Sequence, residues 1–207
     1  MRTSAIAFTA VALFGLTTSI HATTILNENF DELTAELSVT SAGAFSTIDG
    51  TNVDIVGAGD GFASLCAAPE SGNCIDMDGT GGKPQGQLES NQEFAAGTYD
   101  LSFDLVGSQR GPSSSTTVSF GNYDQTFTLA SSDDTDGIIV NELVTLTSPG
   151  YLLFTSDDPT GDEEGSVLDN VVVSTVGSTS VTPEPPALLL LATGLAGLAL
   201  MLHKRLS

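Results

Sequence analysis

The stretch Thr98-Tyr99-Asp100-Leu101-Ser102-Phe103-Asp104-Leu105-Val106 alternates between large apolar and polar side chains. Successive side chains of a β-strand point to opposite faces of its sheet. The alternation therefore predicts a strand with one buried face and one face in water. The predicted buried face carries Tyr99, Leu101, Phe103 and Leu105. The predicted wet face carries Asp100, Ser102 and Asp104.

Strand patterns continue on both sides of this stretch, and turn residues separate them. The predicted strands are Ile25–Phe30, Phe45–Ile48, Asn52–Val56, Asn73–Asp78, Gln87–Ser90, Thr116–Phe120, Gln125–Leu129, Ile138–Thr147, Tyr151–Thr155 and Val167–Val176. Asp49-Gly50 predicts a hairpin between its flanking strands, and Gly121-Asn122 predicts another. In 73–78, Asp76 and Asp78 are assigned to a wet face. Helix signals are weak, with at most one turn in 28–37.

Many short strands with regular turns predict an all-β fold, a single antiparallel β-sandwich. Hairpin signals alone leave open whether the strand order is that of a jelly roll or of an immunoglobulin domain. The predicted sandwich covers residues 23–176, and a linker of small and polar residues follows at 177–182.

The first 22 residues have the features of a secretory signal peptide. Arg2 is followed by an apolar run from Ala5 to Leu16, and Ala22 ends a plausible cleavage site. The alternative, a first membrane helix, is disfavoured because the apolar run is too short to span a bilayer. The sequence therefore predicts a signal helix that signal peptidase removes on export.

The C-terminal stretch 183–207 has three parts in a fixed order. Pro183-Glu184-Pro185 comes first, an uncharged stretch at 187–202 follows, and His203-Lys204-Arg205 ends it. Sixteen helical residues span about 24 Å, slightly less than a hydrocarbon core of about 30 Å. The basic residues Lys204 and Arg205 would stay in the cytoplasm. The sequence predicts a short transmembrane helix with a basic stop.

This three-part order resembles the PEP-CTERM sorting signal of Gram-negative bacteria. The resemblance covers only Pro183–Arg205. It implies an inner-membrane precursor, recognition by an exosortase, cleavage near Pro183-Glu184-Pro185, and delivery to the cell surface or the extracellular matrix. Proteins with this tail are associated with exopolysaccharide and biofilm. Thr182 departs from the pattern, because many relatives carry valine directly before the first proline. The alternative is a plain C-terminal anchor that is never processed.

The strong negative charge of the predicted domain excludes some classes of binding partner. All 26 acidic residues except Glu184 lie in Thr23–Thr182, whose only cations are Lys83 and Arg110. Such a surface repels nucleic acid and anionic lipid. The acids would serve solubility or divalent cation capture. Cys66 and Cys74 are the only cysteines, and an oxidising compartment predicts a disulfide between them.

Catalytic constellations are missing from the predicted mature domain. Both histidines, His21 and His203, lie in the targeting segments. Histidine-based triads and histidine-ligated zinc are therefore excluded. Acid pairs such as Asp100 with Asp104 could in principle serve a glycosidase. The chain has no tryptophan for a sugar to stack on, so we expect a protein that is not an enzyme.

Three short motifs resemble galactose-binding-like jelly rolls. Ile25–Asp31 is similar to their first strand, Ala96–Phe103 to a central strand, and Leu168–Val171 to the last strand. The motifs cover about a third of the domain. In such folds a structural calcium often joins the first strand, a nearby loop and the last strand. The matching positions are Asn27, Glu28, Asp31 and Asp169, with Asp49 or Asp54 as possible additions.

Calcium takes six to eight oxygen ligands, which carboxylates and amides supply. The resemblance therefore implies one structural calcium as the only expected cofactor. Asp76-x-Asp78-Gly79 begins like an EF-hand loop, but the third acid and the closing glutamate are missing.

Two functions from different classes remain. The first is a non-catalytic surface or matrix protein associated with exopolysaccharide. The second is a glycan-binding module in which a tyrosine contacts the sugar. We expect Tyr99 and Tyr151 to face the core, which leaves Tyr123 as the exposed candidate. The two functions differ in whether a concave face carries an exposed aromatic residue near Asn or Asp.

Overall fold

The structure is a computed structural model. It describes residues 18–57, 62, 64–66, 72–81, 84–111, 113–132, 138–158, 163–181, 193–195 and 201–203. Ala22–Val176 forms one compact unit, and the remainder of the chain is assigned to a second unit.

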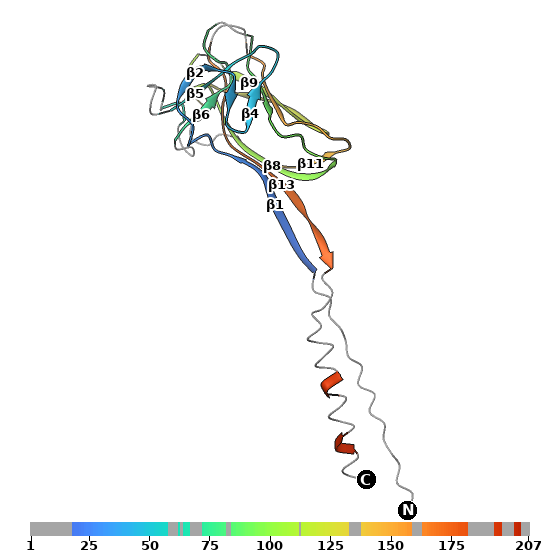
Figure 1. The fold of residues 1–207 in the computed structure, drawn as a ribbon. Helices are drawn as coiled ribbons and strands as arrows, with labels where there is room; N and C mark the ends of the chain where they lie inside the picture. The colour runs from blue at the N-terminus through green and yellow to red at the C-terminus, as the bar shows by residue number, and fades with distance from the viewer. Residues whose placement is uncertain are drawn as a thin grey trace, which may run out of the picture. The chain divides into compact units, whose positions relative to one another are not determined.

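Within the described residues thirteen strands form two antiparallel sheets, which pack as a β-sandwich (Figure 1). The seven-stranded sheet has the order β11-β8-β13-β6-β5-β2, and β1 pairs with β13. Its strands are β1 (Thr18–Glu28), β2 (Glu36–Val39), β5 (Val53–Val56), β6 (Cys74–Asp76), β8 (Gly97–Val106), β11 (Ile138–Leu146) and β13 (Val167–Val181).

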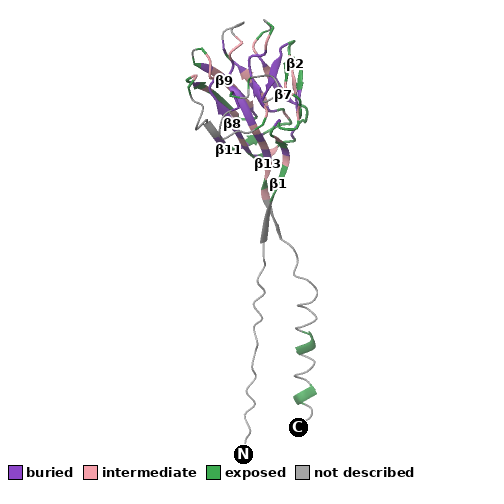
Figure 2. Ribbon diagram, turned by 90° about the vertical axis from the view of Figure 1, so that its left-hand side faces the viewer, coloured by how far each residue is buried: buried purple, intermediate pink, exposed green. Residues whose placement is uncertain are grey.

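The six-stranded sheet has the order β10-β9-β12-β7-β4-β3. Its strands are β3 (Ser41–Ala42), β4 (Phe45–Thr47), β7 (Gln87–Ser90), β9 (Ser114–Phe120), β10 (Tyr123–Leu129) and β12 (Leu153–Ser156). Figure 2 shows the buried positions of the strands in purple, while the loops carry most of the exposed positions.

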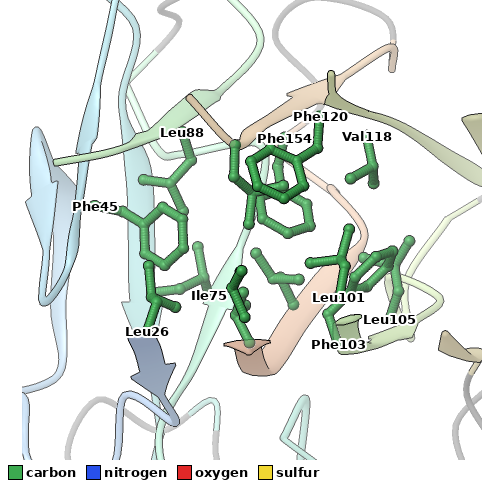
Figure 3. Packing of buried hydrophobic residues seen from close by; sticks show 14 of the residues in the cluster. Leu26, Phe45, Ile75, Leu88, Leu101, Phe103, Leu105, Val118, Phe120 and Phe154 are labelled. Carbon is green, nitrogen blue, oxygen red and sulfur yellow. The ribbon is translucent and has the colours of Figure 1, made fainter. Parts of the chain in front are cut away.

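The core lies between the two sheets. Phe103 of β8 meets Phe154 of β12 edge-on, with ring centroids 5.2 Å apart. Phe154 also contacts Phe45 of β4, at 6.0 Å. Figure 3 shows these rings among the aliphatic side chains that both sheets contribute. Edge-to-face contacts of this kind add to the free energy that apolar burial provides.

The alternation predicted for Thr98–Val106 is confirmed in β8. Leu101, Phe103 and Leu105 are buried, and Tyr99 is only 5% exposed. The predicted hairpin at Gly121-Asn122 is also confirmed, because Tyr123 pairs directly with Phe120. In both places the deciding signal is local: side-chain alternation in one strand and a two-residue turn in the other.

The hairpin predicted at Asp49-Gly50 is wrong. Both residues have positive φ, 54° and 74°, as a tight turn requires. The flanking strands nevertheless belong to different sheets: β4 pairs with β3 and β7, whereas β5 pairs with β2 and β6. The turn therefore passes the chain from one sheet to the other. Turn chemistry fixes the local bend, but the choice of pairing partner depends on the rest of the fold.

Three element boundaries differ from those predicted. β1 begins at Thr18, inside the stretch predicted as signal peptide. β13 continues to Val181 and so includes most of the predicted linker. β2 begins at Glu36, in a stretch predicted to hold at most one helical turn, and pairs with β5. In each case a neighbouring strand supplies hydrogen-bond partners for the backbone, which sequence patterns do not reveal.

The predicted membrane helix at 187–202 lies mostly outside the described residues. Short helical pieces cover 193–195 and 201–203. Among the residues that the structure describes, no helix has the length and apolar character needed to cross a membrane.

Candidate functional site

A groove lies on the outer face of the seven-stranded sheet, over β8, β11 and β13. Its volume is about 450 Å³. Six residues line it with side chains that alternation turns away from the core: Asp100, Ser102, Asn141, Leu143, Val172 and Ser174. Leu101 and Glu142, between them in sequence, complete the lining.

The strand register arranges these six side chains in two rows across the sheet. One row contains Leu143, Asp100 and Ser174, and the other contains Asn141, Ser102 and Val172. Neighbouring strands lie about 4.8 Å apart, and successive rows on one face are about 6.7 Å apart. Residues from three distant parts of the chain therefore form one compact surface.

A bulge in β13 marks one end of the groove. The register between β13 and β8 shifts between Asp169 and Val172, and Asn170 has a positive φ of 51°. A bulge bends its strand and increases the local twist. Asn170 Nδ2 donates a hydrogen bond to Asp104 Oδ2 at 2.9 Å. The third polar residue of β8 is thereby held by β13.

The groove combines hydrogen-bonding groups with aliphatic surface. Asp100 and Asn141 are exposed, and Ser102 and Ser174 are half-buried. Leu143 is 64% exposed, and Val172, at the diagonally opposite corner of the two rows, is half-buried. None of the described lining residues is cationic. The arrangement suits a neutral ligand that carries many hydroxyl groups, and it disfavours an anion.

Sequence reasoning placed Asp100 and Ser102 on a wet face but missed Asn141, Leu143, Val172 and Ser174. One signal was present. In Val140–Val144 an apolar Leu143 occupies an outward position next to an inward valine. An apolar residue on a solvent-exposed face can indicate a binding surface. A single exposed leucine is nevertheless common on protein surfaces.

The three tyrosines occupy three different environments. Tyr99 is buried as predicted, and its hydroxyl donates to the carbonyl oxygen of Ala95 at 2.8 Å. The prediction that Tyr151 faces the core is wrong, because Tyr151 is 43% exposed. It follows the Gly150–Phe94 bridge and precedes β12, so no strand alternation constrains its direction.

Tyr123, the candidate for glycan contact, is half-buried and packs against the core cluster. Burial, and secondarily the charge of Glu142, raises the pKa of its hydroxyl above the ordinary value. Tyr151 is the more exposed ring of the two. A role for Tyr123 in glycan binding stays a prediction.

Two of the expected calcium ligands, Glu28 and Asp31, accept hydrogen bonds from different loop residues. Glu28 accepts hydrogen bonds from the backbone amides of Phe30 and Ala44, one on each carboxylate oxygen, at 3.0 and 2.8 Å. Asp31 accepts from the amide of Asn73 at 3.2 Å and from the Asn29 side chain at 2.9 Å. Both carboxylates therefore already hold loops in place.

The remaining expected ligands differ in burial. Asn27 and Asp49 are exposed, while Asp169 is 2% exposed and accepts a hydrogen bond from the amide of Asn170. Asp54 is buried and accepts hydrogen bonds from the amides of Ser38 and Thr80. The described part of the chain contains no group of three or more acidic, histidine or cysteine side chains that could hold a metal ion. A structural calcium stays a prediction.

Asp76 and Asp78 do not lie on a wet face, so that prediction is wrong. They are 1% and 2% exposed. Asp76 forms an ion pair with Arg110 and accepts hydrogen bonds from the amides of Asp78 and Gly165, at 3.1 and 3.0 Å. Asp76 is buried because the segments around Arg110 and Gly165 pack over this part of the sheet and contact its carboxylate.

Burial raises the pKa of Asp76 to about 7, although the positive charge of Arg110 acts in the opposite direction. Asp54, its partner across the β5–β6 ladder, adds a further small increase. The side chain of Arg110 is 29% exposed and lies 5.8 Å from the ring centroid of Phe62. This pair joins β6 to the loop after β8.

The predicted disulfide between Cys66 and Cys74 is confirmed. Their Cα atoms are 5.7 Å apart. Both residues are buried in a small second cluster with Val56, Val106 and Val167. The bridge therefore attaches the segment after β5 to β6, an interior strand of the seven-stranded sheet.

The sorting residues lie outside the described part of the chain. They are Pro183, Glu184, Pro185, Lys204 and Arg205. The sorting signal therefore stays a prediction from sequence.

Comparisons with known proteins identify no family. No protein-family model matches the chain, and no curated protein matches it. Among solved structures, it is similar to the K3 cleaved adhesin domain of Lys-gingipain from Porphyromonas gingivalis W83. That similarity has a TM-score of 0.45 and 18% identity, and covers 74% of this chain and 100% of that one.

The chain is also similar to a ruminal GH26 endo-β-1,4-mannanase. The TM-score is 0.31 and the identity 12%, over 83% of this chain and 28% of that one. Similarities at these TM-scores say nothing about what this chain does.

Proposed function

We propose that this chain is an exported, non-catalytic β-sandwich protein of the jelly-roll type that acts at the cell surface or in the extracellular matrix of a Gram-negative bacterium. The observation that carries the proposal is the buried Cys66–Cys74 disulfide. Disulfides form and persist in oxidising compartments outside the cytoplasm. The signal-like N-terminus and the PEP-CTERM-like tail support the same destination.

The placement of the acids supports a non-catalytic role. Asp54 and Asp76 are buried and already accept hydrogen bonds from backbone amides. Asp100 and Asp104 share one face of β8, but four strand residues separate their Cα atoms by about 13 Å. Glycosidases hold their two carboxyl groups within about 10 Å of each other. The accessible acids of β8 are therefore poorly spaced for glycoside hydrolysis.

The proposed partners follow from the route of export. Signal peptidase removes residues 1–22, the tail holds the precursor in the inner membrane, and an exosortase acts near Pro183-Glu184-Pro185. The mature protein then associates with extracellular polysaccharide in a biofilm. Nucleic acid is not a partner, because the domain carries only two cations among its many acids.

Replacement of Pro183, Glu184 and Pro185 by alanine tests this proposal. We expect the variant to remain in the inner membrane with its tail uncleaved, as measured by mass spectrometry and membrane fractionation. The matched control is Pro149→Ala, which removes an exposed proline from the β11–β12 connection. A triple variant with the same size and the same surface delivery as the wild type would contradict sorting and favour a plain anchor.

A second candidate function is glycan binding, as in carbohydrate-binding jelly rolls. The groove over β8, β11 and β13 favours it, because carboxylate, amide and hydroxyl groups converge there beside an exposed leucine. The sequence offered Tyr123 for this role, and Tyr151 is an exposed alternative. Alanine variants at these two positions, compared in glycan binding, distinguish the tyrosines from the groove.

A further inference from the structure

We propose that the groove over β8, β11 and β13 is a binding site for a neutral polysaccharide, with Asp100 and Asn141 as the main hydrogen-bonding residues. The proposal rests on the second candidate function, glycan binding, and assigns it to a place that none of the tyrosines occupies. The groove volume of about 450 Å³ lies within the range of small-ligand sites.

Hydrogen-bonding capacity is concentrated at the centre of the groove. Asp100 lies between Leu143 and Ser174 in its row, and Ser102 lies between Asn141 and Val172. A carboxylate accepts several hydrogen bonds, and an amide both donates and accepts. Adjacent hydroxyl groups of a sugar ring present donors and acceptors at similar spacing. The described lining residues therefore match a polyol both in their hydrogen-bond donors and acceptors and in the spacing of these groups.

Aliphatic contact comes from the two corners of the same surface. Leu143 is 64% exposed, which leaves most of its side chain available to a ligand. Val172 is half-buried at the diagonally opposite corner. A sugar ring carries C–H groups on its faces, and burial of these against leucine and valine removes apolar surface from water. The groove therefore needs no aromatic ring to contact a sugar.

Charge selects a neutral ligand over the alternatives. An anionic polysaccharide would meet Asp100 with no cation among the lining residues. A calcium ion would need six to eight oxygen ligands, and Asp100 supplies the only carboxylate among the six outward-facing residues. A basic peptide would be attracted by the acidic domain as a whole, but such attraction weakens with salt. Binding of a neutral sugar does not depend on ionic strength in this way.

The test uses the purified full chain on an array of neutral oligosaccharides, at low and at high salt. The tightest binder is then measured by calorimetry against Asp100→Asn, Asn141→Ala and Leu143→Ala. We expect each of the first two variants to weaken binding about tenfold, since each loses hydrogen bonds to the ligand. The third should weaken binding several-fold. Asp124→Asn, an exposed acid on β10, is the matched control and should bind normally.

Each other outcome overturns the proposal in a recognisable way. Equal binding by wild type and the groove variants, with loss in Tyr151→Ala, would keep glycan binding and reject this site. Retention of no neutral oligosaccharide would reject both, while leaving the export proposal intact. Binding of polylysine alone, abolished by salt, would identify a basic peptide as the ligand instead. Unchanged unfolding midpoints of the groove variants ensure that a loss of binding is not a loss of folding.

Discussion

Asp76 is buried with its carboxylate in contact with Arg110 and two backbone amides. Each of these contacts favours the charged form, yet burial outweighs them and raises the pKa to about 7. The same side chain is ionised above about pH 4 in an unfolded chain. Folding and proton binding are therefore linked at this residue.

The linkage predicts a pH dependence with a definite sign. Between about pH 4 and 7 the folded state binds a proton that the unfolded state does not. The stability that this residue contributes is therefore present at low pH and is lost as the pH rises through about 7. Through Asp76 alone, the free energy of unfolding should therefore fall as the pH rises through this window.

Asp76→Asn removes the titration and keeps the shape. Urea unfolding at constant ionic strength should therefore show that wild type loses more stability than the variant between pH 5 and pH 8. Asp124→Asn, which removes an exposed charge, should follow the wild type. Parallel curves for wild type and Asp76→Asn would contradict a raised pKa at this position.

At the scale of elements, β8 carries both the core and the groove. Its inward residues pack between the sheets, while its outward residues line the groove. β11 and β13 flank it on the two sides. Because β8 is held by two neighbours and by the core, the groove is centred on a constrained strand rather than on a loop.

The two faces of this element predict opposite responses to truncation. Phe103→Ala should lower the free energy of unfolding by about 3–5 kcal/mol, because a buried ring leaves a cavity. Its ring contacts Phe154 at 5.2 Å and Phe127 at 5.8 Å. Leu143→Ala on the outer face of β11 should change stability by no more than about 0.5 kcal/mol. Urea titration of both variants measures the contrast; similar losses would contradict the assignment of faces.

At the scale of the whole molecule, the disulfide attaches the segment after β5 to β6. The two cysteines are eight positions apart in sequence, so the closed loop is short. A loop of this length restricts the unfolded chain by about 2–3 kcal/mol. Reduction should lower stability by this amount, as measured by urea unfolding with and without reductant. Two free thiols in protein recovered from the periplasm would contradict export in the folded, oxidised form.

The predicted calcium also belongs to the whole molecule, because Glu28, Asp31 and Asp169 come from opposite ends of the domain. If they share a cation, it stabilises the folded state by about 2.7 kcal/mol at a hundredfold excess over Kd. The calcium prediction is then that chelator lowers the melting temperature by several degrees, and that Asp169→Ala abolishes the response. Ionic strength must be constant because salt alone screens the acidic surface. An unchanged melting temperature would leave these acids as hydrogen-bond acceptors for loops.

The sequence by itself determined the fold class and the buried face of the central strand. The alternation in Thr98–Val106 is a local property, since side chains two residues apart share a face whatever the strand pairs with. The Gly121-Asn122 turn and the disulfide are also short-range features. Such features can be predicted from a short stretch of sequence, because they do not depend on the rest of the chain.

Only the tertiary structure decided which strands pair and which acids are buried. The Asp49-Gly50 turn has the expected backbone, but its two strands join different sheets. The sequence pattern places Asp76 on a solvent-exposed face, but segments from elsewhere in the chain fold over it and bury it. The groove exists because cross-strand register brings Asp100, Asn141 and Ser174 together from three parts of the chain. Register depends on contacts between residues far apart in sequence, which no local pattern encodes.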